Sequence, residues 1–371
     1  MNRIKFLVPL LALFAMASCG QKNSYTINGQ LQAENFDGNT IYLTDLVSGN
    51  AIDSTTLSNG TFTFNGVVDE AFIGRIAIAP NENGQSYYGI CFVEPGTIFI
   101  DIFSDSLSGT PMNDAYYANF TNNNELLEYR NLLSEYYALY VGAATPEARK
   151  EVEKQYDSID NLYMSATKTV AENVFNSNKN NILGAYALTM LADQMNTAEE
   201  LQSKMNEAGE KVQSFAPLKS RLVMLESISK TAVGQKFTNL KGTDYATGNP
   251  TTLSAMIEGQ VALVDFWASW CGPCRQEIKE NLIRIHKTYA PKGLKVIGID
   301  VNDDPVKHKT VTEDLGITYN QLIDNIDNSA CDIYGINGIP HIILIAADGT
   351  ILARDLRGDA IEEAVKEALA K

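Results

Sequence analysis

Hydrophobic and polar positions alternate in short runs along the first third of the chain. The runs are rich in β-branched and aromatic residues, which is typical of strands, and Asp, Asn and Gly separate them as turn residues do. The predicted strands are 25–29, 40–43, 61–64, 74–78 and 89–93. Short strands at this spacing predict a small all-β, sandwich-like domain over residues 24–115.

The period of the pattern changes over residues 116–233, where apolar side chains recur at intervals of three and four. This is the period of amphipathic helices, and we expect four or five of them. Thr145 before Pro146 fits a helix start, and Thr197 with Glu200 fits a capping box. A stripe of tyrosines lies on these predicted helices: Tyr129, Tyr136, Tyr137, Tyr140, Tyr156 and Tyr163. We expect the stripe to form the helix-packing core, with a groove for a partner as the alternative.

Strand and helix patterns alternate in the last part of the chain, residues 236–371. The predicted strands are 262–266 and 294–299, the helices are 273–289 and 305–315, and a hairpin of 342–345 with 351–354 precedes a closing helix at 359–370. Strand–helix–strand followed by a hairpin and a helix predicts an α/β layer fold with mixed strand directions. The fold class is therefore α/β at the C-terminus, preceded by an all-β domain and a helical region.

Composition narrows the class of protein. The chain has 371 residues, 45% hydrophobic and 20% charged, which indicates a globular protein of two or three domains. Its formal net charge of −16 would be repelled by phosphate backbones, so we expect no nucleic-acid partner.

The N-terminus reads as a processing segment. A short basic start is followed by an apolar run at 6–17, which is too short to span a bilayer as a helix. Two small residues and then Cys19 resemble the lipobox of bacterial lipoproteins, although Met16 stands where that pattern most often has Leu. The resemblance implies a signal peptide at 1–18, lipidation of Cys19 and a membrane anchor in the cell envelope facing the periplasm. The alternative is an ordinary secretory signal beside an incidental cysteine.

The candidate chemistry lies in a Cys-x-x-Cys pair. Cys271 and Cys274 follow the predicted strand 262–266 and lie in the first turn of a helix, where the helix dipole favours a thiolate. Cys271 is the expected nucleophile and Cys274 the thiol that resolves a mixed disulfide. Pro273 suits the first turn, where a missing N–H costs nothing.

These residues resemble the thioredoxin family. The stretch Trp270-Cys271-Gly272-Pro273-Cys274 is the family's motif, and Asp265 falls at its buried carboxylate, which exchanges a proton with the resolving thiol. Ile339-Pro340 falls at its cis-proline loop. The resemblance implies that Trp270, Ile339 and Pro340 bind the substrate, and that the dithiol is the redox group, so no cofactor and no metal are expected.

Within that family, residues 236–371 resemble the TlpA/ResA-type exported reductases. Glu277 matches a glutamate close to their disulfide and is a candidate second proton relay. Lys279 replaces a proline that usually kinks the helix, so we expect a straighter helix here. The β-domain at 24–115 resembles a domain of unassigned function found ahead of thioredoxin domains in exported Gram-negative proteins.

Three other interpretations of the cysteine pair have less support. A zinc site needs a second ligand pair, and neither the other cysteines nor the histidines offer one in sequence. A structural disulfide would not need Asp265 and Pro340 as well. A peroxiredoxin-type peroxidase would need Pro-x-x-x-Thr-x-x-Cys, which does not surround Cys271.

The sequence therefore predicts a thiol–disulfide oxidoreductase that reduces disulfides of exported proteins, such as apocytochrome c, with electrons from a membrane donor. One alternative is a disulfide oxidase or isomerase. Another is a binding lipoprotein whose first 230 residues do the main work, with an auxiliary thioredoxin domain.

Overall fold

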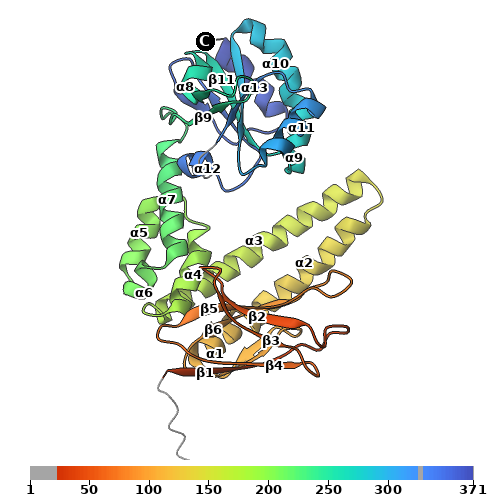
Figure 1. Cartoon of the computed structure of the whole chain (residues 1–371), viewed down its shortest axis with the longest axis vertical. Helices are drawn as coiled ribbons and strands as arrows, with labels where there is room; N and C mark the ends of the chain where they lie inside the picture. Colours follow the sequence, from red (N-terminus) through yellow and green to blue (C-terminus); the bar gives the residue numbers. More distant parts are fainter. Residues whose placement is uncertain (1–22, 325–328, 371) are drawn as a thin grey trace, which may run out of the picture. The chain divides into compact units, whose positions relative to one another are not determined.

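The computed structural model describes residues 23–324 and 329–370 (Figure 1). The predicted signal peptide at 1–18 and the lipidation site Cys19 lie outside the described residues. By internal contacts the chain divides into two compact units, one reaching Leu191 and including Gly209–Val212, the other formed by Ala192–Ala208 and Gln213–Lys371. The domain limits predicted from the sequence at 115/116 and 233/236 stay predictions.

The first unit begins with two four-stranded sheets that share one core. The strands are β1 Ser24–Gln30, β2 Thr40–Asp45, β3 Ala51–Thr56, β4 Thr61–Val67, β5 Phe72–Ile78, β6 Tyr88–Val93, β7 Gly96–Asp101 and β8 Ser106–Ser108. Their order is β4-β1-β7-β8 in one sheet and β3-β2-β5-β6 in the other. Fully buried side chains from both sheets, such as Ile27 and Ile41, belong to one hydrophobic cluster. The all-β, sandwich-like prediction is confirmed.

Three of these strands were not predicted from the sequence. β3 carries almost entirely exposed residues and lies at a sheet edge, so it lacks the apolar alternation that identifies a half-buried strand. β7 pairs in parallel with β1, a long-range pairing that no local pattern indicates.

Helices follow the sheets. They are α1 Pro111–Tyr116, α2 Asn124–Gly142, α3 Pro146–Ser177, α4 Ile182–Ala192, α5 Ala198–Asn206, α6 Glu210–Gln213 and α7 Ala216–Lys230, with a π-helical turn η1 at Tyr117–Thr121. α3 and α5 begin at Thr145 and Thr197, whose side chains cap them as predicted. The expected number of four or five helices is wrong: six lie between 124 and 230. No helix among the described residues is long and apolar enough to cross a membrane.

The tyrosine stripe is not a buried core. Five of its members are half-buried on α2 and α3, and Tyr137 is 61% exposed. The two helices form a hairpin, and a pair of helices covers only one face of each. The expectation of a helix-packing core is therefore wrong in degree.

A seven-stranded sheet organises the C-terminal domain, in the order β10-β9-β13-β12-β11-β14-β15. Its strands are β9 Lys241–Asp244, β10 Pro250–Thr252, β11 Val261–Trp267, β12 Leu294–Asp300, β13 Asn320–Ile323, β14 His341–Ile345 and β15 Ile351–Ala353. Its helices are α8 Leu253–Ile257, α9 Gly272–Glu277, α10 Ile283–Tyr289, α11 Pro305–Leu315, α12 Ser329–Tyr334 and α13 Asp359–Leu369, with π-helical η2 Ile278–Leu282 and 3₁₀-helical η3 Ala290–Lys292.

The central strand β11 is parallel to β12 and antiparallel to β14. One hydrophobic cluster contains Val264 and Phe266, and another contains Leu263 and Trp267. Alternate residues of β11 therefore point into two cores, as expected for a strand buried on both faces. The predicted α/β layer fold with mixed strand directions is confirmed, and β9, β10 and β13 were not among the strands predicted from the pattern.

Helix α7 packs closely against α12 of the same unit. Gly335 has a φ of +63°, and a Cβ there would approach the backbone of α7 at Met224 and Ile228. Arg354 donates hydrogen bonds to the carbonyls of Thr231 and Tyr334. The segment after α7 is thus fixed to the C-terminal domain.

Candidate active site

The cysteine pair lies where β11 passes into a helix. Cys271 is the N-cap of α9, and a disulfide joins it to Cys274. The Cys271 Sγ accepts a hydrogen bond from the backbone N–H of Cys274 at 3.2 Å. Cys271 is 4% exposed and Cys274 is fully buried, so Cys271 is the more accessible sulfur.

The loop before β14 faces this disulfide. The peptide bond between Ile339 and Pro340 is cis. The Ile339 carbonyl oxygen lies 3.7 Å from the Cys271 Sγ, although 68 residues separate the two in sequence. The register of β14 against β11, which pairs His341 with Phe266, brings the two segments together.

Asp265 is buried on the central strand. It is 1% exposed, and neither carboxylate oxygen has a hydrogen-bond partner. Burial, reinforced by the nearby charge of Glu277 and opposed by Arg357, raises the pKa of Asp265 to about 8. A carboxyl group with this pKa can take up and release a proton near neutral pH.

Glu277 lies near Asp265 but is held by other partners. One carboxylate oxygen accepts a hydrogen bond from the Asn281 side chain at 2.6 Å, and the carboxylate also accepts from the backbone N–H of Gly358 at 3.2 Å. The residues that follow it form the π-helical η2 despite the presence of Lys279. This π-turn interrupts the α-helical hydrogen bonding, and the expectation of a straighter helix stays a prediction.

Trp270 and Arg357 complete the surroundings of the pair. Trp270 is 60% exposed, and its indole N–H donates to the Asn302 carbonyl at 2.9 Å. Arg357 donates a hydrogen bond to the Pro340 carbonyl and forms an ion pair with Asp355 at 2.8 Å. Sequence reasoning did not identify Arg357, because nothing local links it to the loop 17 residues earlier.

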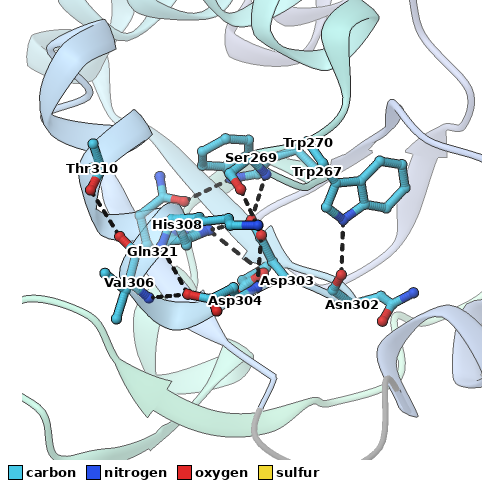
Figure 2. Close-up of polar contacts among 12 residues, drawn as sticks. Trp267, Ser269, Trp270, Asn302, Asp303, Asp304, Val306, His308, Thr310 and Gln321 are labelled. Carbon is cyan, nitrogen blue, oxygen red and sulfur yellow. Dashed lines mark hydrogen bonds and ion pairs between the residues drawn. The ribbon is translucent and has the colours of Figure 1, made fainter.

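A second polar group lies on the other side of the turn that leads to Cys271. The Asp303 carboxylate accepts hydrogen bonds from the backbone and the hydroxyl of Ser269 (Figure 2). The Nδ1 of His308 lies 3.5 Å from carboxylate oxygens of both Asp303 and Asp300. Ligand atoms of these three residues lie within 4.8 Å of one another, a spacing at which a metal ion can also bind.

Asp303 and Asp304 read from the sequence as the start of a helix, but their side chains differ in role. Asp304 caps α11 by accepting from the N–H groups of Val306 and Lys307. Asp303 points to Ser269 instead. No sequence signal separates two adjacent aspartates in this way.

The remaining cysteines and His341 lie in unreactive surroundings. Burial raises the pKa of Cys91 to about 12, and burial with nearby carboxylates raises that of Cys331 to about 11. Burial, with the charge of Arg354, lowers the pKa of His341 to about 4. His341 is therefore neutral near pH 7 and supplies no positive charge to Cys271.

Comparison with known proteins gives the family of the C-terminal domain. A sequence model of the AhpC/TSA family matches residues 233–354, and one described as a domain of unknown function (DUF4369) matches residues 25–116. The thiol:disulfide interchange protein HelX of Rhodobacter capsulatus is 29% identical over 120 residues, covering 32% of this chain and 65% of HelX. The thiol-disulfide oxidoreductase ResA of Bacillus thuringiensis is 25% identical over 142 residues, covering 38% and 79%.

Among solved structures, the thioredoxin domain of a thiol-disulfide oxidoreductase from Bacteroides vulgatus is 30% identical. The match covers 37% of this chain and 96% of that domain, with a TM-score of 0.35. The chain spans slightly less than two thirds of HelX, and about two thirds of this chain lies outside these matches.

Proposed function

We propose that this chain, whose C-terminal domain is similar to thioredoxin-like thiol-disulfide oxidoreductases, reduces disulfides of exported proteins through Cys271 and Cys274. The observation that carries the proposal is the position of the disulfide. It lies against the cis Ile339–Pro340 loop, on the domain whose central strand carries the buried, unpartnered Asp265.

The proposed cycle begins with the dithiol form. The Cys271 thiolate attacks a disulfide sulfur of the substrate, forms a mixed disulfide and expels one substrate thiolate. The Ile339 carbonyl and Trp270 border the sulfur and would contact the bound substrate chain. Cys274 then attacks Cys271, which releases the second substrate thiol and leaves the Cys271–Cys274 disulfide.

Asp265 is the proposed proton acceptor for Cys274. Its raised pKa, about 8, lies close to that of a thiol, so a proton passes between them without a large energetic difference. Glu277 is near enough to raise the pKa of Asp265, and we propose that it assists through its charge. Two electrons from a membrane donor restore the dithiol, so the cycle needs no cofactor.

The direction of electron flow is proposed from the residues between the cysteines. Thioredoxins, which carry Gly-Pro there, have potentials near about −270 mV, against about −120 mV for DsbA-type oxidants. We propose that the protein works in the periplasm, anchored through Cys19, and that an exported disulfide protein such as apocytochrome c is its substrate.

The reduction potential of the Cys271–Cys274 pair tests this proposal. The 19–371 chain with Cys19→Ser is equilibrated in dithiothreitol or glutathione buffers, and free thiols are scored by alkylation. We expect a value near the thioredoxin end of the range. A value near that of DsbA-type oxidants would favour the disulfide oxidase or isomerase instead.

A phenotype test addresses the other candidate, a binding lipoprotein with an auxiliary redox domain. This candidate is supported by the separate β-domain, which matches a family of its own. Replacing Cys271 and Cys274 together by Ser should abolish function in the cell if the domain is the working part. Retained function would favour the binding lipoprotein.

A further inference from the structure

The turn that carries the nucleophile is held from one side by a single loop. Residues 268–270 connect β11 to Cys271, and the loop 301–303 follows the neighbouring strand β12. Asp303 binds Ser269 twice, through its backbone N–H at 2.5 Å and its hydroxyl at 2.6 Å. The backbone N–H of Val301 donates to the Trp267 carbonyl at 3.1 Å, and Asn302 accepts from the Trp270 indole.

These contacts differ in how well water can replace them. Trp270 is exposed, so its bond to Asn302 competes with solvent. Ser269 is 4% exposed and the Asp303 side chain is fully buried. A carboxylate that accepts two hydrogen bonds in a buried place is a strong anchor, because charge-assisted bonds are about twice as strong as neutral ones.

The Asp303 carboxylate is also in contact with the buried side chain of His308. His308 is fully buried and contacts the Trp267 ring, with ring centroids 4.7 Å apart. Its Nδ1 lies 3.5 Å from a carboxylate oxygen of Asp303 and from one of Asp300. Burial lowers the pKa of His308, so its ring is mostly neutral near pH 7 and contacts these carboxylates as a polar group. His308 therefore packs against both the Trp267 ring and the Asp303 carboxylate.

We propose that Asp303 is a positioning residue for the redox reaction, which fixes the turn before Cys271 through Ser269 and thereby sets the disulfide–dithiol equilibrium of the Cys271–Cys274 pair. This rests on the proposed function of the pair. Asp303 touches neither sulfur; it acts through Ser269, which Trp270 connects to Cys271.

Two physical effects of Asp303 point in the same direction. A turn held in place keeps Cys271 where it can bond to Cys274, which favours the disulfide. A buried negative charge near the turn disfavours the Cys271 thiolate, which also favours the disulfide over the reduced form. Loss of Asp303 should therefore make the pair more oxidising.

The test is the equilibrium of the full chain with glutathione, in which the protein disulfide and two glutathione thiols give the protein dithiol and one glutathione disulfide. For Asp303→Asn we expect the ratio of disulfide to dithiol to fall about tenfold, equivalent to about +30 mV in potential. Ser269→Ala keeps the Asp303 charge and loses the hydrogen bond from the Ser269 hydroxyl. For this variant we expect the ratio of disulfide to dithiol to fall about threefold.

Asp304→Asn is the matched control. It removes the same charge one residue away, from a side chain that caps α11 and does not bind Ser269, and Asn also serves as an N-cap. We expect its equilibrium to stay within about 1.5-fold of the wild type. Tryptophan fluorescence, which arises only from Trp267 and Trp270, verifies that each variant keeps the domain folded.

Four results would overturn the inference. Equal shifts in Asp303→Asn and Asp304→Asn would mean that only overall charge matters, and a folded Asp303→Asn with the wild-type ratio would mean that the anchor is irrelevant. If Asp303→Asn does not fold, a wild-type ratio of disulfide to dithiol in Ser269→Ala would contradict the inference. A shift of the wild type on treatment with a chelator, as large as that of Asp303→Asn, would mean that a bound cation holds the cluster instead.

The outcome also separates this inference from the proposed function. A wild-type pair that does not exchange with glutathione at any ratio contradicts the redox function and the inference together. A wild-type pair that exchanges normally, with variants that coincide with it, contradicts the inference alone.

Discussion

The β-domain and the C-terminal domain differ in whether their buried polar groups have hydrogen-bond partners. In the β-domain, Asn113 is fully buried and each end of its amide is bonded, to the backbone N–H and carbonyl of Phe92 at 2.8 Å. In the C-terminal domain, Asp265, Asp300, His308 and Tyr319 are buried and carry polar atoms without a hydrogen-bond partner. Among the described residues, such orphaned atoms occur outside that domain only at Thr167.

This difference indicates that the buried polar groups of the β-domain stabilise its fold, whereas those of the C-terminal domain are available for a reaction. A buried polar group without a partner costs about 1–3 kcal/mol, so a fold retains several of them in one region only where something compensates. Here they lie on β11 and β12, on helices α10 and α11 and just before β13, in the same domain as the cysteine pair. The β-domain, with its partners satisfied, resembles a rigid support.

The largest expected effect is the loss of turnover when Cys274 of the C-terminal domain is replaced, compared with replacement of Cys91 of the β-domain. Cys274→Ser removes the thiol that resolves the mixed disulfide on Cys271. Turnover of a disulfide substrate should therefore fall at least about 10³-fold. Cys91→Ser should leave turnover unchanged, because burial raises the pKa of Cys91 to about 12 and no thiolate forms there. Reduction of a model disulfide followed by absorbance measures both.

Trapping provides the control for this prediction. Cys274→Ser should accumulate a covalent adduct with the substrate through Cys271, visible as a mass increase that a reductant removes. Equal turnover in Cys274→Ser and the wild type would contradict the two-thiol cycle. Loss of turnover in Cys91→Ser would mean that the β-domain takes part in the chemistry.

The sequence identifies the disulfide-bonded cysteine pair well and the residues that hold it in place poorly. The spacing of Cys271 and Cys274 marks the pair, and the family resemblance adds Asp265 and Pro340. Cys271 and the loop before Pro340 lie together, at the ends of β11 and β14. Arg357 and Asp303 reach the site through loops, where the partner is set by tertiary contacts and no periodicity marks it. Exposed β3, the short β8, β9, β10 and β13, and β7, which pairs with β1 far away in sequence, were not predicted, because no local pattern marks them.

The next effect concerns Asp265 and stability as a function of pH. Its folded pKa, about 8, lies above the unfolded value near 3.8, so the folded state holds a proton that the unfolded state releases. Stability from this group is greatest below about pH 4 and falls as pH rises to about 8, where it levels off. Asp265→Asn does not titrate and should stabilise the oxidised domain above that pH by a few kcal/mol, since each pKa unit is worth about 1.4 kcal/mol.

Urea unfolding at a series of pH values, followed by tryptophan fluorescence, measures this difference within the C-terminal domain alone. The variant and the wild type should converge near pH 4, where both side chains are neutral. Asp300→Asn serves as a comparison, because burial and two nearby carboxylates raise the pKa of Asp300 to about 7. A constant gap between Asp265→Asn and the wild type at all pH values would contradict the titration of Asp265.

The smallest expected effect is a loss of stability in the β-domain, in contrast to the gain expected for Asp265→Asn. β6 is the edge strand of its sheet, and Asn113 satisfies the outward N–H and carbonyl of Phe92 as a neighbouring strand would. Asn113→Ala leaves both backbone groups buried and unpaired, and should destabilise this domain by about 1–3 kcal/mol. Hydrogen exchange of the peptide that covers β5 and β6 measures the loss, with the exposed Asn83→Ala as the control. The redox pair should keep its wild-type glutathione equilibrium in Asn113→Ala; a shift would mean that the two domains are energetically coupled, and that the satisfied polar groups of the β-domain also serve the reaction.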